Sequence, residues 1–153
     1  MDIKFLGDAI KFGMELETMA ACVLEDMSRD AATVEVKKAL MTVLDMTKKR
    51  KEYLQKLYND NIYSDMDTGV FEPIGLIDSA LYLPQDELSK EERYPNMILK
   101  ALEIEEKTRD FYLTLATSLK SRRKEVSRIF GKMAQENSDL QLKLKSIYEV
   151  FQL

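Results

Sequence analysis

Residues 98–119 read Ile-Leu-Lys-Ala-Leu-Glu-Ile-Glu-Glu-Lys-Thr-Arg-Asp-Phe-Tyr-Leu-Thr-Leu-Ala-Thr-Ser-Leu. Every third or fourth position belongs to a mostly apolar stripe, which Glu105 interrupts near its middle. A stripe with this spacing is typical of a helix that packs its apolar face against other helices. The stretch therefore predicts a long amphipathic helix over about 96–120 that carries a carboxylate on its inner face.

The chain as a whole predicts four helices in a single domain. The 153 residues are enough for one hydrophobic core, and with only five Gly and three Pro the chain encodes few turns. Polar breaks lie at Ser28–Asp30 and at 118–124. We expect an all-α, four-helix up-down bundle over 1–153, with helices at about 5–28, 32–58, 96–120 and 123–151.

An acidic connector separates the two pairs of helices. Residues 59–98 contain nine acidic side chains against two basic ones, together with all three prolines. Proline cannot continue a helix and favours irregular connections. We expect two helical hairpins, 5–58 and 96–152, joined by a crossover over 59–95 with a short helix near 74–82.

The two hairpins are similar in sequence when one is laid over the other with a constant offset of 90 residues and no gaps. The hydrophobic pattern matches as well, which indicates a duplicated helical hairpin. The corresponding positions include Glu15 and Glu105, Thr47 and Asn137, Arg50 and Leu140, and Cys22 and Tyr112. This alignment predicts that Cys22 faces the interior.

Polar residues interrupt all four apolar stripes near their middles. They are Glu15, Thr47 with Arg50, Glu105 and Asn137. In an antiparallel bundle these positions can meet at one level of the core. Desolvation of an ionised side chain in a core costs several kcal/mol, so a metal ion or an ion pair must offset that cost.

The composition excludes several kinds of chemistry. The chain contains no His and a single Cys. Ser-His-Asp and Cys-His catalysis, imidazole metal sites and thiolate clusters are therefore excluded. A lone cysteine, an N-terminus without a signal-like apolar segment and the absence of long apolar runs lead us to expect a cytoplasmic protein with no membrane partner.

Two motifs resemble those of a known family. Residues 101–112 (Ala-Leu-Glu-Ile-Glu-Glu-Lys-Thr-Arg-Asp-Phe-Tyr) and 130–140 (Phe-Gly-Lys-Met-Ala-Gln-Glu-Asn-Ser-Asp-Leu) resemble helix motifs of the ferritin-like superfamily, most closely its rubrerythrin-like branch. Members of this superfamily hold two iron ions with one Glu from each of two helices and Glu-x-x-His from each of the other two. The resemblance implies a ferritin-like bundle with a long crossover between helices two and three.

Most of the metal ligands that the resemblance implies are replaced in this chain. The corresponding positions are Glu15, Thr47, Arg50, Glu105, Asn137 and Leu140. Two of them keep a carboxylate, none is a histidine, and one is a permanent cation. The resemblance therefore implies a degenerate di-iron site in which an arginine occupies the former metal volume.

An arginine can replace the metal charge because its guanidinium is always protonated and forms paired hydrogen bonds with carboxylates. We expect Arg50 to pair with Glu15, with Glu105 or with both. The other cations that could do so are Lys48, Lys51 and Arg109.

The function that we expect from these features is non-catalytic. The chain would be a ferritin-like protein that has lost its di-iron centre, binds no cofactor and acts as a scaffold, a regulatory subunit or the binding partner of another protein. The resemblance implies a homodimer. A sequence pI of about 5.1 disfavours nucleic acid as a partner.

Two other functions compete with this expectation. An atypical di-iron-type oxidoreductase or ferroxidase would hold iron or manganese in an oxygen-rich site made by Glu15, Glu105, Glu136 and Asn137. A small-molecule or lipid-binding bundle would use the vacated centre as a pocket.

Overall fold

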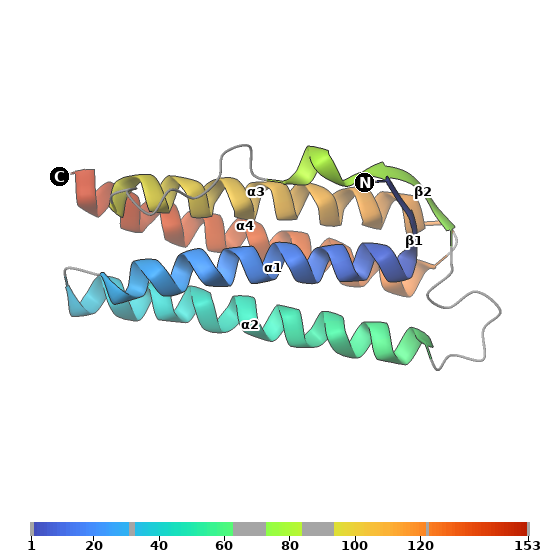
Figure 1. Ribbon diagram of the computed structural model, residues 1–153, viewed down its shortest axis with the longest axis horizontal. Helices are drawn as coiled ribbons and strands as arrows, with labels where there is room; N and C mark the ends of the chain where they lie inside the picture. The colour runs from blue at the N-terminus through green and yellow to red at the C-terminus, as the bar shows by residue number, and fades with distance from the viewer. Residues whose placement is uncertain (1, 31–32, 63–72, 84–93, 122, 153) are drawn as a thin grey trace.

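A computed structural model of the chain describes residues 2–30, 33–62, 73–83, 94–121 and 123–152. The described residues are largely helical, which confirms the predicted helices to within a few residues at their ends. Within the described residues the chain forms four long helices, which pack along a common direction (Figure 1). They are α1 (Leu6–Arg29), α2 (Val34–Ile62), α3 (Tyr94–Leu119) and α4 (Lys124–Gln152).

Hydrophobic clusters at the two ends of the bundle define the helix directions. One cluster joins the first halves of α1 and α4 to the second halves of α2 and α3. The other cluster joins the second halves of α1 and α4 to the first halves of α2 and α3. Because α1 and α4 each contact both α2 and α3, every helix runs antiparallel to the neighbours it packs against.

The helix directions do not alternate strictly along the chain. The two clusters and Figure 1 show that α2 and α3 run in the same direction, so the up-down order expected from the sequence is wrong at this step. A chain that leaves the end of α2 must travel the length of the bundle before α3 begins, which requires a long connection. Residues 63–72 and 84–93 of this crossover lie outside the described residues.

The described part of the crossover contains a strand that the sequence did not predict. In place of a short helix near 74–82, β2 (Pro73–Asp78) is followed by a 3₁₀ turn, η2 (Ser79–Tyr82). β2 pairs antiparallel with β1 (Asp2–Phe5), and Ile3 lies opposite Ile77. Both isoleucine side chains are buried in the adjacent hydrophobic cluster, so this small sheet closes one end of the core.

The crossover is attached to α3 by specific contacts. The Tyr82 hydroxyl hydrogen-bonds the Thr114 hydroxyl at 2.9 Å, and the Tyr82 ring packs edge-on against Phe111. The Lys107 ammonium donates to the carbonyl of Leu81 at 3.2 Å. These contacts hold Leu81 and Tyr82, in the described part of the crossover, against α3.

A layer of buried polar residues separates the two hydrophobic clusters. It takes residues from all four helices, and its members are Glu17, Thr47, Arg50, Glu105, Thr108 and Asn137. Desolvated polar groups in a core require partners because each unpartnered one destabilises the fold by kcal/mol amounts. The polar layer is therefore the part of the core in which each side chain needs a specific hydrogen-bond or ion-pair partner.

The buried positions of the two hairpins correspond, but the offset in residue number differs between the two pairs of helices. The buried positions of α2 match those of α4 at the predicted offset of 90 residues, for example Val36 with Val126. Those of α1 match α3 at an offset of 88, for example Leu16 with Ile104. The second hairpin thus contains two more residues than the first around its turn.

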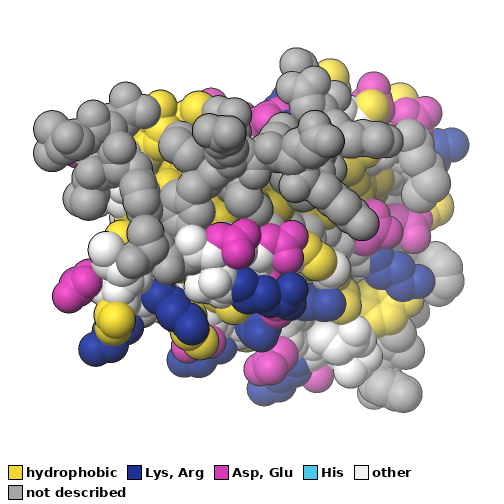
Figure 2. All heavy atoms as spheres, turned by 60° about the vertical axis from the view of Figure 1, so that its left-hand side comes forward, with side chains coloured by type: hydrophobic (Ala, Val, Ile, Leu, Met, Phe, Trp, Pro, Cys, Tyr) yellow, Lys and Arg dark blue, Asp and Glu magenta, His cyan; other side chains and the backbone are white. Residues whose placement is uncertain are grey.

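The outer surface carries mixed charges. On the face drawn in Figure 2, Lys and Arg side chains lie interspersed with Asp and Glu side chains over the lower part of the molecule. Among the described residues, no helix combines the length and the apolar character that a bilayer-spanning segment needs.

Candidate functional site

Arg50 lies at the centre of the polar layer. It projects inward from α2 and is 4% exposed. Its Nε donates to Oε1 of Glu17 at 3.0 Å, and its Nη2 donates to Oε2 of the same carboxylate at 2.9 Å. Two parallel bonds of this kind are the strongest arrangement that an arginine makes with a carboxylate.

A second carboxylate, from α3, contacts the same guanidinium. Arg50 Nη2 donates to Oε2 of Glu105 at 3.2 Å. The Asn137 amide, on α4, donates to that same Oε2 at 2.6 Å. One cation from α2 therefore bridges carboxylates from α1 and α3, and all four helices contribute a side chain to the cluster.

Tyr112 completes the hydrogen bonding of Glu17. Its hydroxyl donates to Glu17 Oε1 at 2.7 Å, and the side chain is fully buried. The ring fits because Gly13 on α1 has no side chain: a Cβ there would lie 3.3 Å from Tyr112 Cε1. The absence of a side chain at Gly13 therefore leaves room for Tyr112 in the polar layer.

The electrostatics of the cluster follow from burial and from these contacts. Burial, opposed by the charge of Arg50, raises the pKa of Glu105 to about 7. Burial also disfavours charge on Arg50, but the carboxylates of Glu17 and Glu105 outweigh this effect and raise its pKa above its ordinary value. With a proton on Glu105, one guanidinium faces one ionised carboxylate, so the core is electrically balanced.

Burial, together with the nearby charge of Glu17, raises the pKa of Tyr112 well above its ordinary value. The tyrosine therefore stays neutral at physiological pH and keeps its proton for the bond to Glu17. A neutral phenol held in this way acts as a hydrogen-bond donor and does not contribute a charge to the layer.

Three polar atoms of the cluster have no hydrogen-bond partner among the described residues. They are Arg50 Nη1, Glu105 Oε1 and Asn137 Oδ1. One is a donor and the other two are acceptors. The hydrogen-bonding capacity of the cluster is therefore incompletely used within the described protein.

The structure brings three of the predicted site residues into direct contact: Arg50, Glu105 and Asn137. Thr47 and Leu140 are also buried, but they do not join the hydrogen-bonded cluster. The Thr47 hydroxyl donates to the carbonyl of Val43 in its own helix, and Leu140 belongs to a hydrophobic cluster.

The prediction that Glu15 points inward is wrong. Glu15 is exposed, and the buried carboxylate of α1 is Glu17, which the sequence reasoning missed. Cys22, predicted to face the interior, is also exposed. Both errors have one cause: a single offset of 90 was applied to a helix pair whose buried positions align at 88.

The cations that competed with Arg50 have other partners or positions. Lys48 pairs with Glu25 on the surface, and Arg109 donates to Gln141 and Asp110. Lys51 is half-buried and lines a shallow depression that also contains Glu15. Within the described residues, Arg50 is therefore the cation that contacts Glu17 and Glu105.

The donor set does not fit a di-iron centre. The oxygen ligands considered for one, Glu15, Glu105, Glu136 and Asn137, are not brought together: Glu15 is exposed and Glu136 lines a groove on the surface. No group of three or more Asp, Glu, His or Cys side chains in the described part of the chain is arranged to hold a metal ion. The two carboxylates that do approach each other already share a permanent cation, which repels a metal.

Comparison with known proteins found no matching family model, no matching curated protein and no matching solved structure. The similarity to ferritin-like proteins therefore stays a prediction that rests on the residues of this chain.

Replacing Arg50 alone should destabilise the protein strongly. Arg50→Met leaves the buried carboxylate of Glu17 without its cation, and we expect a loss of about 3–5 kcal/mol in the free energy of unfolding. Chemical denaturation followed by circular dichroism measures this loss. The matched control is Lys49→Met, at an exposed neighbouring position on α2, which should change stability by less than about 0.5 kcal/mol.

Replacing the whole cluster tests whether the loss comes from unpaired charge. The triple variant Glu17→Leu/Arg50→Met/Glu105→Leu removes every buried charge of the layer, and we expect it to regain most of the stability that Arg50→Met loses. A triple variant as unstable as the single one would contradict this interpretation.

Stability should fall as the pH rises through the titration range of Glu105. Its pKa is raised from 4.5 to about 7 in the folded state, so between these values the folded state binds more protons than the unfolded state. The free energy of unfolding should therefore decrease from about pH 4.5 to about pH 7 through this group. Denaturation curves at several pH values measure the slope, and Glu105→Gln should abolish this contribution. The control variant Glu106→Gln, at an exposed neighbour, should keep it.

Proposed function

We propose that this chain is a non-catalytic, ferritin-like protein of rubrerythrin-like ancestry whose di-iron centre has been replaced by an ion pair. It acts as a scaffold or as a binding partner of another protein. The observation that carries the proposal is the position of the Arg50 guanidinium between the carboxylates of Glu17 and Glu105.

The arrangement of the cluster supports this origin. In di-iron carboxylate bundles, two helices each supply one carboxylate and the other two supply a further carboxylate with a histidine, all at one level of the core. Here α1 and α3 supply Glu17 and Glu105 at such a level, and α2 and α4 supply Arg50 and Asn137. The Arg50 cation provides positive charge where metal ions would otherwise provide it.

The two competing functions receive less support. An oxidoreductase with iron or manganese would require displacement of Arg50, since its guanidinium holds the two central carboxylates. A pocket in the vacated centre would require open space there, but Arg50, Tyr112 and Asn137 are buried side chains that fill this level. No observation at the centre of the bundle favours either function.

A homodimer is part of the proposal, and exposed apolar side chains support it. They include Leu76 and Leu81 of the crossover, which are 68% and 63% exposed, and Leu113 on α3. Apolar side chains that gather at a surface are often covered by a protein partner.

Light scattering of the eluting protein tests the oligomeric state. The expected mass is twice that of the 17.7 kDa chain, and Leu81→Asp should shift the protein towards the monomer. Elution of the unmodified protein as a monomer at all concentrations would contradict the dimer.

Elemental mass spectrometry tests the loss of the metal centre. Untagged protein, prepared without chelators from cells supplied with iron, manganese and zinc, should contain far less than one metal ion per chain. Added Mn²⁺ should leave the melting temperature unchanged, because a ligand that binds the folded state would raise it. Stoichiometric metal would refute the proposal and would call for oxidase and peroxidase assays.

A further inference from the structure

A groove lies between α2 and α4, on the surface above the polar layer. Its volume is about 440 Å³, within the range of cavities that hold small molecules. α2 lines it with Met46, Lys49, Arg50 and Tyr53, and α4 lines it with Ile129, Lys132, Met133 and Glu136. Each set has helical spacing of three and four residues, so two facing stripes form the walls.

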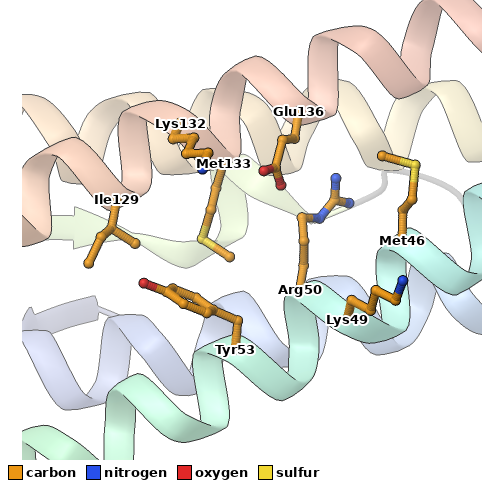
Figure 3. Close-up of a pocket in the computed structure, with 8 residues that line it drawn as sticks. All are labelled: Met46, Lys49, Arg50, Tyr53, Ile129, Lys132, Met133 and Glu136. Atoms are coloured by element: carbon orange, nitrogen blue, oxygen red, sulfur yellow. The ribbon is translucent and has the colours of Figure 1, made fainter.

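Apolar side chains gather at one end of the groove, where Lys132 also lies beside Met133, and most of the charged side chains lie towards the other end, where Met46 lies (Figure 3). Figure 3 shows Tyr53, Ile129 and Met133 gathered at one end, whereas the Arg50 guanidinium and the Glu136 carboxylate lie further along towards Met46. Tyr53 is 46% exposed, so part of its ring is available to a bound molecule. A ligand that matches this arrangement has an apolar body and one polar head.

Arg50 does not offer a ligand in the groove an accessible hydrogen-bond donor. Arg50 forms part of the groove wall, and its Nη1 has no hydrogen-bond partner among the described residues although the side chain is almost fully buried. Nη1 is sealed from solvent, so the cations that a polar head can reach are Lys49 and Lys132 at the rim.

The charges of the groove favour an anion. Lys49 and Lys132 lie on opposite walls and are exposed, while Glu136 is the one acidic side chain among the lining residues. The guanidinium of Arg50 is already paired with Glu17 and Glu105, so Lys49 and Lys132 supply the positive charge that faces a ligand. Complementary charge at the rim of a binding site guides a ligand of opposite charge into the site and favours it over one of like charge.

We propose that the α2–α4 groove binds a small amphiphilic monocarboxylate, whose carboxylate is attracted by Lys49 and Lys132 at the rim and whose apolar chain packs on Tyr53, Ile129 and Met133. The inference goes beyond the proposed function and does not depend on the ancestry of the bundle, since it rests on the groove itself. In a metal-free scaffold, binding of a small acid in this groove would change the surface that the protein presents.

A matched pair of probes tests the preferred charge. Decanoate and decylammonium share one apolar chain and carry opposite charges, and isothermal titration calorimetry with the full chain measures both. We expect saturable binding of one decanoate per chain and a rise in melting temperature, with decylammonium at least about tenfold weaker. Acetate, which lacks the apolar chain, should not compete at equal concentration.

Surface variants locate the binding in the groove. Lys49→Gln/Lys132→Gln should weaken decanoate roughly tenfold, and Glu136→Gln should tighten it, because the first change removes attraction and the second removes repulsion. Tyr53→Ala should weaken decanoate without changing the preferred charge of the head group. The control variant Lys56→Gln/Lys145→Gln removes two exposed lysines from the same helices outside the groove and should bind as the unmodified protein does.

Three results would overturn the proposal. They are tighter binding of decylammonium than of decanoate, no saturable binding of decanoate by the folded protein, and decanoate binding that Lys49→Gln/Lys132→Gln leaves unchanged. All the variants change exposed or half-exposed positions, and circular dichroism verifies that each one folds. Failure of this proposal would leave the metal content of the protein, and hence the proposed function, unaffected.

Discussion

The contact between Arg50 and the two carboxylates determines how the four helices are aligned. A guanidinium that is nearly removed from water must meet its partners in good geometry, because an unpaired buried charge destabilises a protein by several kcal/mol. Sliding α2 along α1 by one helical turn would separate Arg50 from Glu17 and bury both charges unpaired. The hydrophobic clusters on either side supply stability but tolerate such shifts better, since apolar contacts are less directional. The polar layer therefore selects one alignment among several that the apolar stripes would permit.

Much of this arrangement could be predicted from the sequence. The stripes of α2 and α4 were placed correctly, including Arg50 and Asn137, because strongly periodic segments with few alternatives indicate their inner faces clearly. Glu105 was also placed correctly. The error on α1 arose because Glu15 and Glu17 both lie near the middle of the helix, and the gapless alignment favoured Glu15. An offset of 88 would have matched Val23 and Leu24 with Phe111 and Tyr112, a better apolar agreement.

Other features could not be predicted because they depend on contacts between distant parts of the chain. The strand β2 begins with Pro73 and contains Gly75 at a positive φ of 82°, and neither residue suggests a strand by itself. It forms because β1 offers a pairing edge and because the core beneath needs cover from Ile3 and Ile77. The hydroxyl of Tyr112 was likewise unassigned, since its role depends on the space above Gly13.

The reciprocal bonds between the hairpins have a consequence for assembly. The bidentate pair of Glu17 and Arg50 lies within the first hairpin, and the bond between Asn137 and Glu105 lies within the second. Within the polar layer, each hairpin donates one hydrogen bond to the other, from Arg50 to Glu105 and from Tyr112 to Glu17. When the two hairpins pack together, the first contributes the Glu17–Arg50 pair, whose charges cancel. The second contributes Glu105, whose carboxyl group loses its contact with water. Because burial in the assembled core raises the pKa of that group, its protonation favours the assembled bundle.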